Sequence, residues 1–323
     1  MKRLIAMTVV GMLAAGQAAL AQTPLKVIVF PSVSNLGLLA AQHNGIFAKH
    51  GLAVEIINTP NSDELRDGLA AGRYQIAHAA VDNLVAMVEL AKADAVIVTG
   101  GDSGFNNLYV QPEIKSYADL RGKTVVVDAP NTAYALLLYK MLKDNGVVKG
   151  EYTIKPVGGT QQRLATMQQD KANAAAMLNP PFSFRAEQAG LKSLGSAAVA
   201  VGAYQAGGAF VMRGWAQANA DTLVRYIRAY VEGLRWAMNP ANRTETTALF
   251  AERLKLPSDI AQKSYDLMVH PANGLAIEAK FDAAGFRNVL KLRAEIEGQW
   301  GGNPPPPDKY LDLTYYDKAL AGL

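Results

Sequence analysis

The sequence predicts an α/β protein of two lobes, each with a mostly parallel sheet flanked by helices. Short apolar runs alternate with amphipathic stretches from Leu25 to about Ala200, which is the pattern of doubly wound sheets. Long amphipathic helices follow, and no polar or Pro/Gly-rich linker separates two independent halves. We therefore expect the chain to leave its first lobe and later return to it, rather than to form two consecutive domains.

The first block contains four predicted strands with three helices between them. Gly51 and Gly72 occupy sites suited to helix C-caps, and Asn61 with Glu64 has the spacing of a capping box. The strands are expected at Leu25 to Phe30, Ala53 to Asn58, Gln75 to Ala80 and Ala95 to Thr99. The helices are expected at Leu36 to His50, Ser62 to Ala71 and Asp82 to Lys92.

The second block begins with a stretch that is suited to ligand binding. Ser116 and Asp119 have the spacing of a capping box, and Thr124 to Val127 is a β-branched run typical of a buried strand. Asn131 or Thr132 can then cap an apolar helix, whose unpaired N–H groups suit an anion or a polar ligand head. Further strands are expected at Thr153 to Val157, Ala174 to Leu178 and Lys192 to Val199, and helices at Thr132 to Asn145, Thr160 to Gln169 and Pro181 to Ala189.

The last third of the chain is expected to be mostly helical. Extended stretches near Leu108 to Val110 and Ala209 to Met212 would connect the two lobes. Pro304 to Pro307 predicts a stiff spacer within a Pro-rich C-terminal tail at 301–323. Helices are expected at Asn219 to Met238, Arg243 to Lys255, Pro257 to Met268 and Ala279 to Glu297.

The first residues have the features of a cleaved secretory signal. Lys2 and Arg3 precede an apolar run from Leu4 to Ala15, and a small-x-small pattern ends at Ala21. The run is shorter than the roughly 20 apolar residues of a membrane span. We expect residues 1–21 to be removed and the mature protein to lie in the periplasm. A retained N-terminal membrane helix is the alternative.

Composition argues against several function classes. The chain has no cysteine, which excludes disulfides, thiolate nucleophiles and cysteine metal sites. Removal of Lys2 and Arg3 leaves 30 of the 32 basic residues against 28 acidic ones, and no basic cluster with interleaved aromatics occurs, so no nucleic-acid partner is expected. The four histidines show no close pair, so no metal is expected, and no P-loop or Rossmann fingerprint predicts a nucleotide cofactor.

Several motifs together resemble a known family. Ala118 to Lys123 precedes a strand, Asn131-Thr132 precedes a helix, and Asn179 to Phe182 follows a strand. Gly45 to Leu52 leads into Val54-Glu55. With the export signal, this pattern resembles the type II periplasmic substrate-binding proteins of ABC importers, in the aliphatic-sulfonate, nitrate and taurine group that includes thiamine-pyrimidine precursor proteins. The resemblance covers nearly all of the mature chain.

This resemblance implies the periplasmic-binding-protein type II fold and the delivery of a small solute to a membrane permease. Two lobes would close over the solute about a hinge, without catalysis. Lobe 1 would comprise residues 25–108 and 207–300, and lobe 2 residues 109–206. We expect the protein to be a monomer.

The ligand loops of the family match five loops of this sequence, which supply most of the candidate ligand-binding residues. These are Ser32, Ser34, Asn35, Ala80, Asp82, Gly101, Ser103, Asn131, Thr132 and Asn179, with His78 at a strand end and Phe182 beside a loop. Helix capping is the alternative role for the first three residues and is the favoured one for Asp82. For His78 and Phe182, and for Phe105, Tyr134 and Tyr204 near the same loops, the alternative is burial in the core.

The charges near these loops bear on the solute. The nearest cations are Arg163, Arg185 and Arg213, and helical sequence around each of them favours a solvated surface position. We therefore expect a small organic solute, such as a sulfonate, a carboxylate or a pyrimidine-like heterocycle, held by N–H groups and hydroxyls and covered by aromatics. A nitrate-sized or polyanionic ligand is disfavoured.

Two enzyme classes are the alternatives. A secreted enzyme on the same fold could act on a small heterocycle, but the cysteine-rich stretch of the eukaryotic thiamine-pyrimidine synthases is missing. Gly101-Asp102-Ser103-Gly104 resembles the nucleophile signature of trypsin-like serine proteases, yet Phe105 replaces the next glycine and no suitable upstream histidine motif occurs. We expect no catalytic residue.

Overall fold

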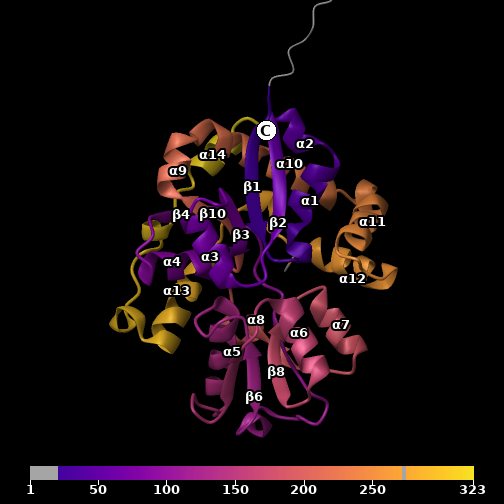
Figure 1. Ribbon diagram of the computed structural model, residues 1–323, viewed down its shortest axis with the longest axis vertical. Coiled ribbons are helices and arrows are strands. Elements are labelled where there is room, and N and C mark those ends of the chain that lie inside the picture. Colours follow the sequence, from indigo (N-terminus) through magenta and orange to yellow (C-terminus); the bar gives the residue numbers. More distant parts are fainter. Residues whose placement is uncertain (1–20, 271–273) are drawn as a thin grey trace, which may run out of the picture.

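Two five-stranded sheets, each flanked by helices, form two lobes stacked along the long axis of the molecule (Figure 1). The computed structural model describes residues 21–270 and 274–323. The predicted signal peptide therefore lies outside the described residues, apart from Ala21. Within the described parts of the chain, no helix is long and apolar enough to cross a bilayer.

The first sheet has the strand order β2-β1-β3-β10-β4. β1 pairs in parallel with β2 and β3, whereas β10 is antiparallel to both β3 and β4. Four strands thus run in one direction and β10 runs against them. The bounds are β1 (Thr23–Val29), β2 (Leu52–Asn58), β3 (Ile76–Ala80), β4 (Ala95–Thr99) and β10 (Gly207–Met212).

The second sheet repeats this arrangement with the order β7-β6-β8-β5-β9. β6 is parallel to β7 and β8, and β5 is antiparallel to β8 and β9. The bounds are β5 (Asn107–Val110), β6 (Thr124–Val127), β7 (Thr153–Pro156), β8 (Asn173–Leu178) and β9 (Lys192–Ser196).

The predicted fold class is confirmed, with sheets that are mixed rather than purely parallel. The two reversed strands, β5 and β10, contain the stretches predicted to connect the lobes, but each is a strand within one sheet, and the connections are the segments that precede these strands. The chain leaves the first sheet at the carboxyl end of β4 and later re-enters that sheet from the same edge, so β10 must run back against its neighbours. The same reasoning explains β5 in the second sheet. Ligands of such sheets bind outside the carboxyl ends of the strands, which here face the other lobe.

Alternating side chains of the strands divide the core of the first lobe into two layers. Val27 and Val29 of β1 pack in a cluster with buried residues of α1 and α10, whereas Ile28 packs in the cluster that contains residues of α3, α4 and α13. This alternation is the period-two pattern of a strand buried on both faces. The helices of this lobe are α1 (Leu36–His43), α2 (Ile46–Lys49), α3 (Ser62–Ala70), α4 (Asp82–Glu89), α9 (Arg213–Ala218), α10 (Ala220–Met238), α11 (Arg243–Arg253), α12 (Ser258–Met268), α13 (Ala283–Glu297) and α14 (Thr314–Leu320).

The second lobe has the same layered construction on a smaller scale. Val125 and Val127 of β6 pack with α5 residues, and Val126 packs on the opposite face with residues of α6 and α7. The helices are α5 (Ala133–Asp144), α6 (Thr160–Gln169), α7 (Phe182–Gln188) and α8 (Ala197–Val201).

Some predicted elements end earlier than expected. The helix expected at Leu36 to His50 is divided into α1 and α2, because Gly45 adopts a left-handed conformation with φ of 64°. The strand expected at Lys192 to Val199 stops at Ser196, whose side chain accepts a hydrogen bond from the Ala198 N–H and caps α8.

The C-terminal segment expected to be a Pro-rich tail is instead folded against the first lobe. Tyr315, Tyr316 and Ala319 of α14 are buried in the same cluster as residues of α10. Upstream, Tyr310 is fully buried and its hydroxyl donates to Glu89 Oε1 at 2.7 Å. The proline run predicts a stiff spacer, but the apolar surface of the aromatic residues that follow it is buried only when the segment returns to the lobe.

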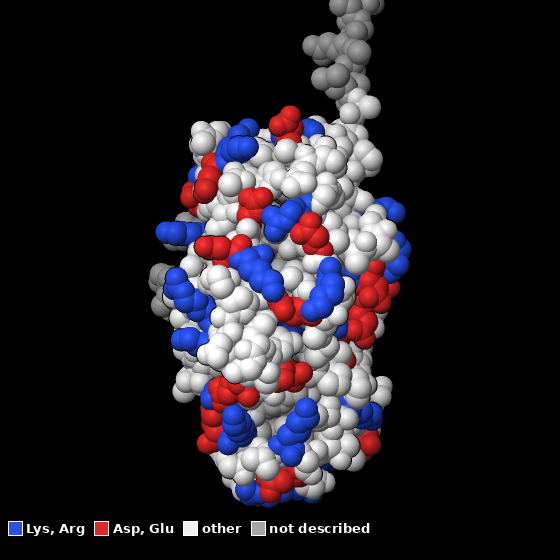
Figure 2. Space-filling view, turned by 90° about the vertical axis from the view of Figure 1, so that its left-hand side faces the viewer, with Lys and Arg blue, Asp and Glu red and all other residues white. Residues whose placement is uncertain are grey.

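Charges of both signs are distributed over the molecular surface. On the face shown in Figure 2, Lys and Arg side chains are interspersed with Asp and Glu, and no extended basic area forms. This distribution matches the nearly balanced charge of the sequence, which has 32 basic and 28 acidic residues.

Candidate ligand-binding cleft

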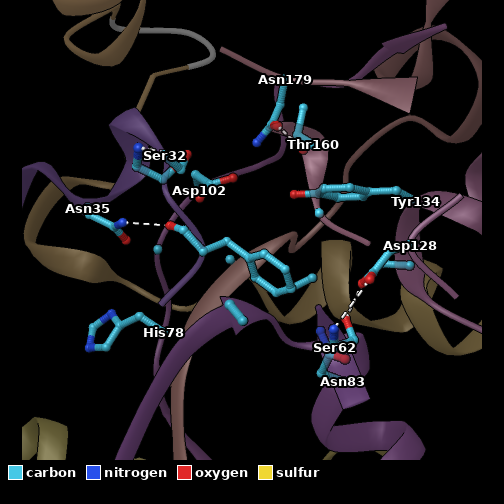
Figure 3. A pocket seen from close by; sticks show the side chains of 18 of the residues that line it. Ser32, Asn35, Ser62, His78, Asn83, Asp102, Asp128, Tyr134, Thr160 and Asn179 are labelled. Carbon is cyan, nitrogen blue, oxygen red and sulfur yellow. Dashed lines mark hydrogen bonds between the residues drawn. The ribbon is translucent and has the colours of Figure 1, made fainter. Parts of the chain in front are cut away.

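A cleft of about 800 Å³, including the solvent at its mouth, lies between the two lobes at the carboxyl ends of the strands (Figure 3). Its lining residues come from both lobes. Those of lobe 1 are Phe30, Pro31, Ser32, Ser34, Asn35, Ser62, His78, Ala79, Ala80, Asn83, Gly101, Asp102, Gly207, Gly208 and Tyr230. Those of lobe 2 are Asp128, Thr132, Ala133, Tyr134, Gly159, Thr160, Arg163 and Asn179.

The turn after β1 presents polar groups to the cleft. Ser32 precedes a short 3-10 turn, and its hydroxyl accepts a hydrogen bond from the Ser34 N–H at 3.1 Å. Asn35 donates from Nδ2 to the Phe30 carbonyl at 2.8 Å, as Figure 3 shows. This contact leaves the Asn35 carbonyl oxygen as the acceptor that can contact a solute. Ser32 therefore both caps the turn and lines the cleft, whereas the Asn35 side chain lines the cleft without capping α1.

His78 lies in the middle of β3 and forms part of the cleft floor. Its Nε2 shares a hydrogen bond with the Tyr226 hydroxyl at 2.9 Å, and its ring lies edge-on to Tyr230 with centroids 4.7 Å apart. Burial lowers the pKa of His78 to about 3, because the charged form would lose its hydration. His78 is therefore a neutral group of the site at physiological pH.

Asp102 lies where the chain leaves β4 for the other lobe. Its Oδ1 accepts the Gly104 N–H at 2.8 Å, and the Ser34 hydroxyl also donates to its carboxylate. Burial raises the pKa of Asp102, and these two hydrogen bonds oppose that effect. Gly207 is needed beside it, since a Cβ at this position would collide with Asp102 Oδ2.

The wall from lobe 2 carries a second carboxylate, Asp128, at the end of β6. The Ser62 hydroxyl donates to Asp128 Oδ2 at 2.5 Å and the Ser62 N–H donates to Oδ1 at 3.3 Å (Figure 3). Because Ser62 begins α3 of lobe 1, this contact joins the two walls of the cleft. The Gly159 N–H makes a second such contact by donating to the Pro60 carbonyl at 2.9 Å.

Arg163 of α6 is a buried cation in the cleft wall. Its Nε donates to the Met177 carbonyl at 3.1 Å, Nη1 to the Gly158 carbonyl at 3.0 Å and Nη2 to the Thr160 hydroxyl at 2.9 Å. The guanidinium also lies 5.8 Å from the centroid of the Tyr134 ring. Burial lowers the pKa of Arg163, and the nearby charge of Asp128 counteracts this shift.

Thr160 and Asn179 complete the lobe 2 wall. The Thr160 hydroxyl donates to Asn179 Oδ1 at 2.7 Å, which leaves the Asn179 amide nitrogen as a donor (Figure 3). Thr132 lines the cleft as well, although its hydroxyl donates to the Ala129 carbonyl at 2.9 Å rather than capping α5. Burial raises the pKa of Tyr134 to about 12, so its hydroxyl keeps its proton.

Eight of the twelve predicted site residues line the cleft, and four do not. The eight are Ser32, Ser34, Asn35, His78, Ala80, Gly101, Thr132 and Asn179. Asp82 is buried in α4 and pairs with Arg293 of α13. The Asn131 carbonyl accepts from Arg293 Nη2 at 2.8 Å, and its side chain points toward Arg66. Both residues therefore form part of a contact between the lobes beside the cleft.

The other two lie in different surroundings. Ser103 lines a separate, smaller cavity of about 190 Å³ with Asn106 and Tyr204. Phe182 is buried in the core of lobe 2, and the Arg185 guanidinium lies 5.8 Å from its ring centroid. Of the two roles considered for Phe182, contact with a ligand and burial in the core, the structure shows burial in the core.

Sequence reasoning missed several lining residues for an identifiable reason. Asn83 and Asp102 lie next to predicted residues, within loops that the resemblance already identified. Arg163 was expected on the surface, because α6 carries several polar residues around it. Tyr230 belongs to α10, far along the chain, and no local pattern connects it with the cleft.

In the part of the chain that the structure describes, no group of three or more His, Cys, Asp or Glu side chains is arranged to hold an ion. The three charged residues of the cleft lining are Asp102, Asp128 and Arg163.

Comparison with known families agrees with this architecture. The family model described as NMT1/THI5 like matches residues 33–243, about two thirds of the chain. The chain belongs to the NMT1/THI5-like family. This assignment confirms the resemblance that the motifs indicated.

This NMT1/THI5-like protein is similar in sequence to a curated relative. It is 24% identical over 232 residues to an ABC transporter periplasmic binding protein of Brachyspira hyodysenteriae, a match that covers 65% of this chain and 64% of that protein. The matched region thus spans slightly less than two thirds of the relative's length.

The fold is shared with two solute-binding proteins of known structure. The nitrate-binding protein NrtA from Synechocystis has a TM-score of 0.79 at 14% identity, over 94% of this chain and 89% of that one. The alkanesulfonate-binding protein SsuA from Xanthomonas axonopodis, bound to MOPS, has a TM-score of 0.70 at 16% identity, over 92% of this chain and 97% of that one. At these identities the likeness concerns the fold.

Proposed function

We propose that this NMT1/THI5-like protein is the solute-binding component of an ABC importer. It captures a small organic solute between its lobes and delivers it to a permease in the membrane. One observation supports this proposal most strongly: a cleft at the carboxyl ends of both sheets, with polar side chains from each lobe facing the same space. The relative is named as a periplasmic binding protein of an ABC transporter, and the two structures are those of nitrate-binding and alkanesulfonate-binding proteins, which supports the same role.

The connections between the lobes support capture by closure. The lobes are joined by the segments between β4 and β5 and between β9 and β10, so rotation about these segments opens the cleft. Contacts such as Ser62 with Asp128 form only when the walls approach each other. A solute that contacts both walls stabilises the closed form in proportion to its preference for that form.

The remaining parts of the proposal follow from the same role. The protein acts in the periplasm after removal of the signal at residues 1–21, binds as a monomer and docks on its permease through the closed form. The residues proposed to contact the solute are the cleft residues described above, and Asp82, Ser103, Asn131 and Phe182 act only through the surrounding structure.

Native mass spectrometry of the mature protein, followed by calorimetry, tests the function. We expect a co-purified small mass, or one member of a panel of organic solutes, to bind without being consumed. A solute present at about 100 times its dissociation constant adds about 2.7 kcal/mol to the free energy of unfolding. Chromatography of the solute after incubation distinguishes the enzyme alternative, because a chemically altered solute contradicts a purely binding role.

Two matched variants connect binding with the cleft. Asn179→Leu removes an amide that lines the cleft, whereas Asn303→Leu changes an exposed amide near the C-terminus. We expect the first change to lower affinity at least tenfold and the second to leave it unchanged. Equal effects of the two variants would place the binding site elsewhere.

A further inference from the structure

The charged groups of the cleft are not arranged to receive an anion. Its lining contains two carboxylates, Asp102 and Asp128, and one cation, Arg163. The nature of the solute depends on which of these charges is already compensated by the protein.

Arg163 uses three of its five N–H donors on acceptors of the protein. Each of its three guanidinium nitrogens donates to a protein acceptor, and the side chain is 2% exposed. Two of these acceptors are backbone carbonyls of lobe 2, so the arginine braces its own lobe. Arg163 therefore differs from the arginines that bind a carboxylate or sulfonate with a free, bidentate face.

Asp128 is the carboxylate compensated by this cation and by lobe 1. The charge of Asp128 acts on Arg163, and Ser62 donates to both of its oxygens. These contacts satisfy Asp128 while the cleft is closed.

Asp102 has no such compensation. Its carboxylate receives the Gly104 N–H and the Ser34 hydroxyl, and no positively charged side chain contributes to its environment among the described residues. It is 9% exposed and lines the cleft. A buried carboxylate of this kind is stabilised by a positive charge or by further N–H donors.

A second, independent acceptor lies in the same cleft. Asn83 of α4 is 2% exposed, and its Oδ1 has no hydrogen-bond partner among the described residues. Leaving a buried carbonyl oxygen without a donor is costly, so a donor from the solute is favoured there. Asn35 adds a third acceptor, since its amide nitrogen is already used by Phe30.

We propose, on the basis of the proposed binding function, that the solute carries an ammonium or amino group, with Asp102 as its counter-ion and Asn83 as a further acceptor. The Tyr134 and Tyr230 rings in the lining provide apolar surface for the body of such a solute, and aromatic faces also attract an ammonium group. A sulfonate or carboxylate without an amino group would instead place a negative charge next to Asp102.

The experiment compares solutes that share a carbon skeleton and differ in one group. Benzyl, pyridylmethyl and butyl skeletons are each used as the amine, the alcohol, the carboxylate and the sulfonate, with binding measured by thermal shift and calorimetry. We expect the tightest binder to be an amine and the anions of the same skeleton to bind at least tenfold more weakly.

Asp102→Asn is the matched variant, because it removes the charge and keeps the shape and the acceptor for Gly104. We expect it to weaken amine binding at least tenfold and to change alcohol binding less than threefold. Asn83→Leu is the second variant, which is expected to weaken amines without improving anions, and it replaces Asp102→Asn should that variant fail to fold.

The outcomes separate this inference from the proposed function. A sulfonate or carboxylate as the tightest binder, or amine binding that Asp102→Asn weakens no more than alcohol binding, overturns the amino-solute inference and leaves the binding function in place. Absence of binding by all compounds and of any co-purified mass counts against the binding function itself, and the inference fails with it.

Discussion

Two buried arginines, Arg293 and Arg163, solve the same electrostatic problem in different ways. Arg293 of lobe 1 donates to both carboxylate oxygens of Asp82 and reaches across to the Asn131 carbonyl of lobe 2. Arg163 donates only to neutral acceptors of its own lobe. Burial lowers the pKa of both groups. For Arg293 the charge and hydrogen bonds of Asp82, together with the charges of Tyr204 and Glu297, outweigh burial and raise its pKa, whereas the pKa of Arg163 remains lowered. An arginine can thus be buried with a carboxylate partner, as Arg293 is, or with neutral acceptors alone, as Arg163 is. The positions of these acceptors determine whether the arginine connects the two lobes or stabilises one of them.

The largest expected effect comes from breaking the ion pair. Asp82→Asn leaves Arg293 buried without an opposite charge, so we expect the free energy of unfolding to fall by about 3–5 kcal/mol. Urea denaturation measures this loss. Asp308→Asn, at an exposed position, is the control and should change stability by less than about 0.5 kcal/mol. A double variant, Asp82→Leu with Arg293→Met, should be more stable than Asp82→Asn alone; an equal or larger loss would contradict the argument.

Removing Arg163 should lower the free energy of unfolding by less than Asp82→Asn does, because Arg163 makes no direct contact with a carboxylate that would be left unpaired. Arg163→Met leaves the Met177 and Gly158 carbonyls without their donor, for an expected loss of about 2–3 kcal/mol. Arg163→Lys should restore little of it, since one ammonium cannot reach three acceptors in different directions. The same denaturation experiment on Arg213→Met, whose arginine is partly exposed, gives the reference for an ordinary surface change. Full recovery in the lysine variant would rule out the bracing role.

His78 is a third case, a buried base that avoids charge altogether. Above its ordinary pKa of about 6.5, both the folded and the unfolded chain are neutral at this residue. Below that pH the unfolded chain takes up a proton, but the folded protein, with a His78 pKa of about 3, does not, so stability falls with decreasing pH. Between pH 7.5 and pH 5 the loss should reach about 2 kcal/mol, with a limiting slope of about 1.4 kcal/mol per pH unit.

His78→Gln tests this pH dependence. Unfolding of the ligand-free variant and of the original protein is compared at pH 7.5 and pH 5.0. The variant should lose about 2 kcal/mol less than the original protein over this interval. Identical losses would show that His78 becomes protonated in the folded state.

The smallest effect is expected at the contact between Ser62 and Asp128. Ser62→Ala removes the hydroxyl but keeps the backbone N–H bond to Asp128, so about 1 kcal/mol of stability should be lost. Because this contact joins the lobes, small-angle scattering of the variant should show a larger population of the open form. Ser34→Ala, a change within lobe 1, should leave the scattering profile as it is; an equal shift in both variants would mean that Ser62 has no special part in closure.

Much of the site could be predicted because its polar groups lie at junctions between strands and helices. Ser32, Asn35 and Thr132 each begin a turn or helix after a strand, and parallel strands bring such junctions to one edge of a sheet. Asp82 has the same sequence signature and nevertheless turns away, because Arg293, more than two hundred residues later in the chain, offers it an opposite charge. Local patterns cannot reveal a partner at that distance.

The sequence by itself determined the two-lobed α/β fold, the family and the loops that surround the cleft, since apolar periodicity, caps and turns act over a few residues. The tertiary structure alone decided that β5 and β10 run against their sheets and that the C-terminal segment folds back onto lobe 1. It also decided the charge of the cleft: Arg163 is used by backbone carbonyls and Asp102 is left uncompensated. The physical reason is that burial and hydrogen-bond partners depend on segments distant in sequence, which only the folded chain brings together.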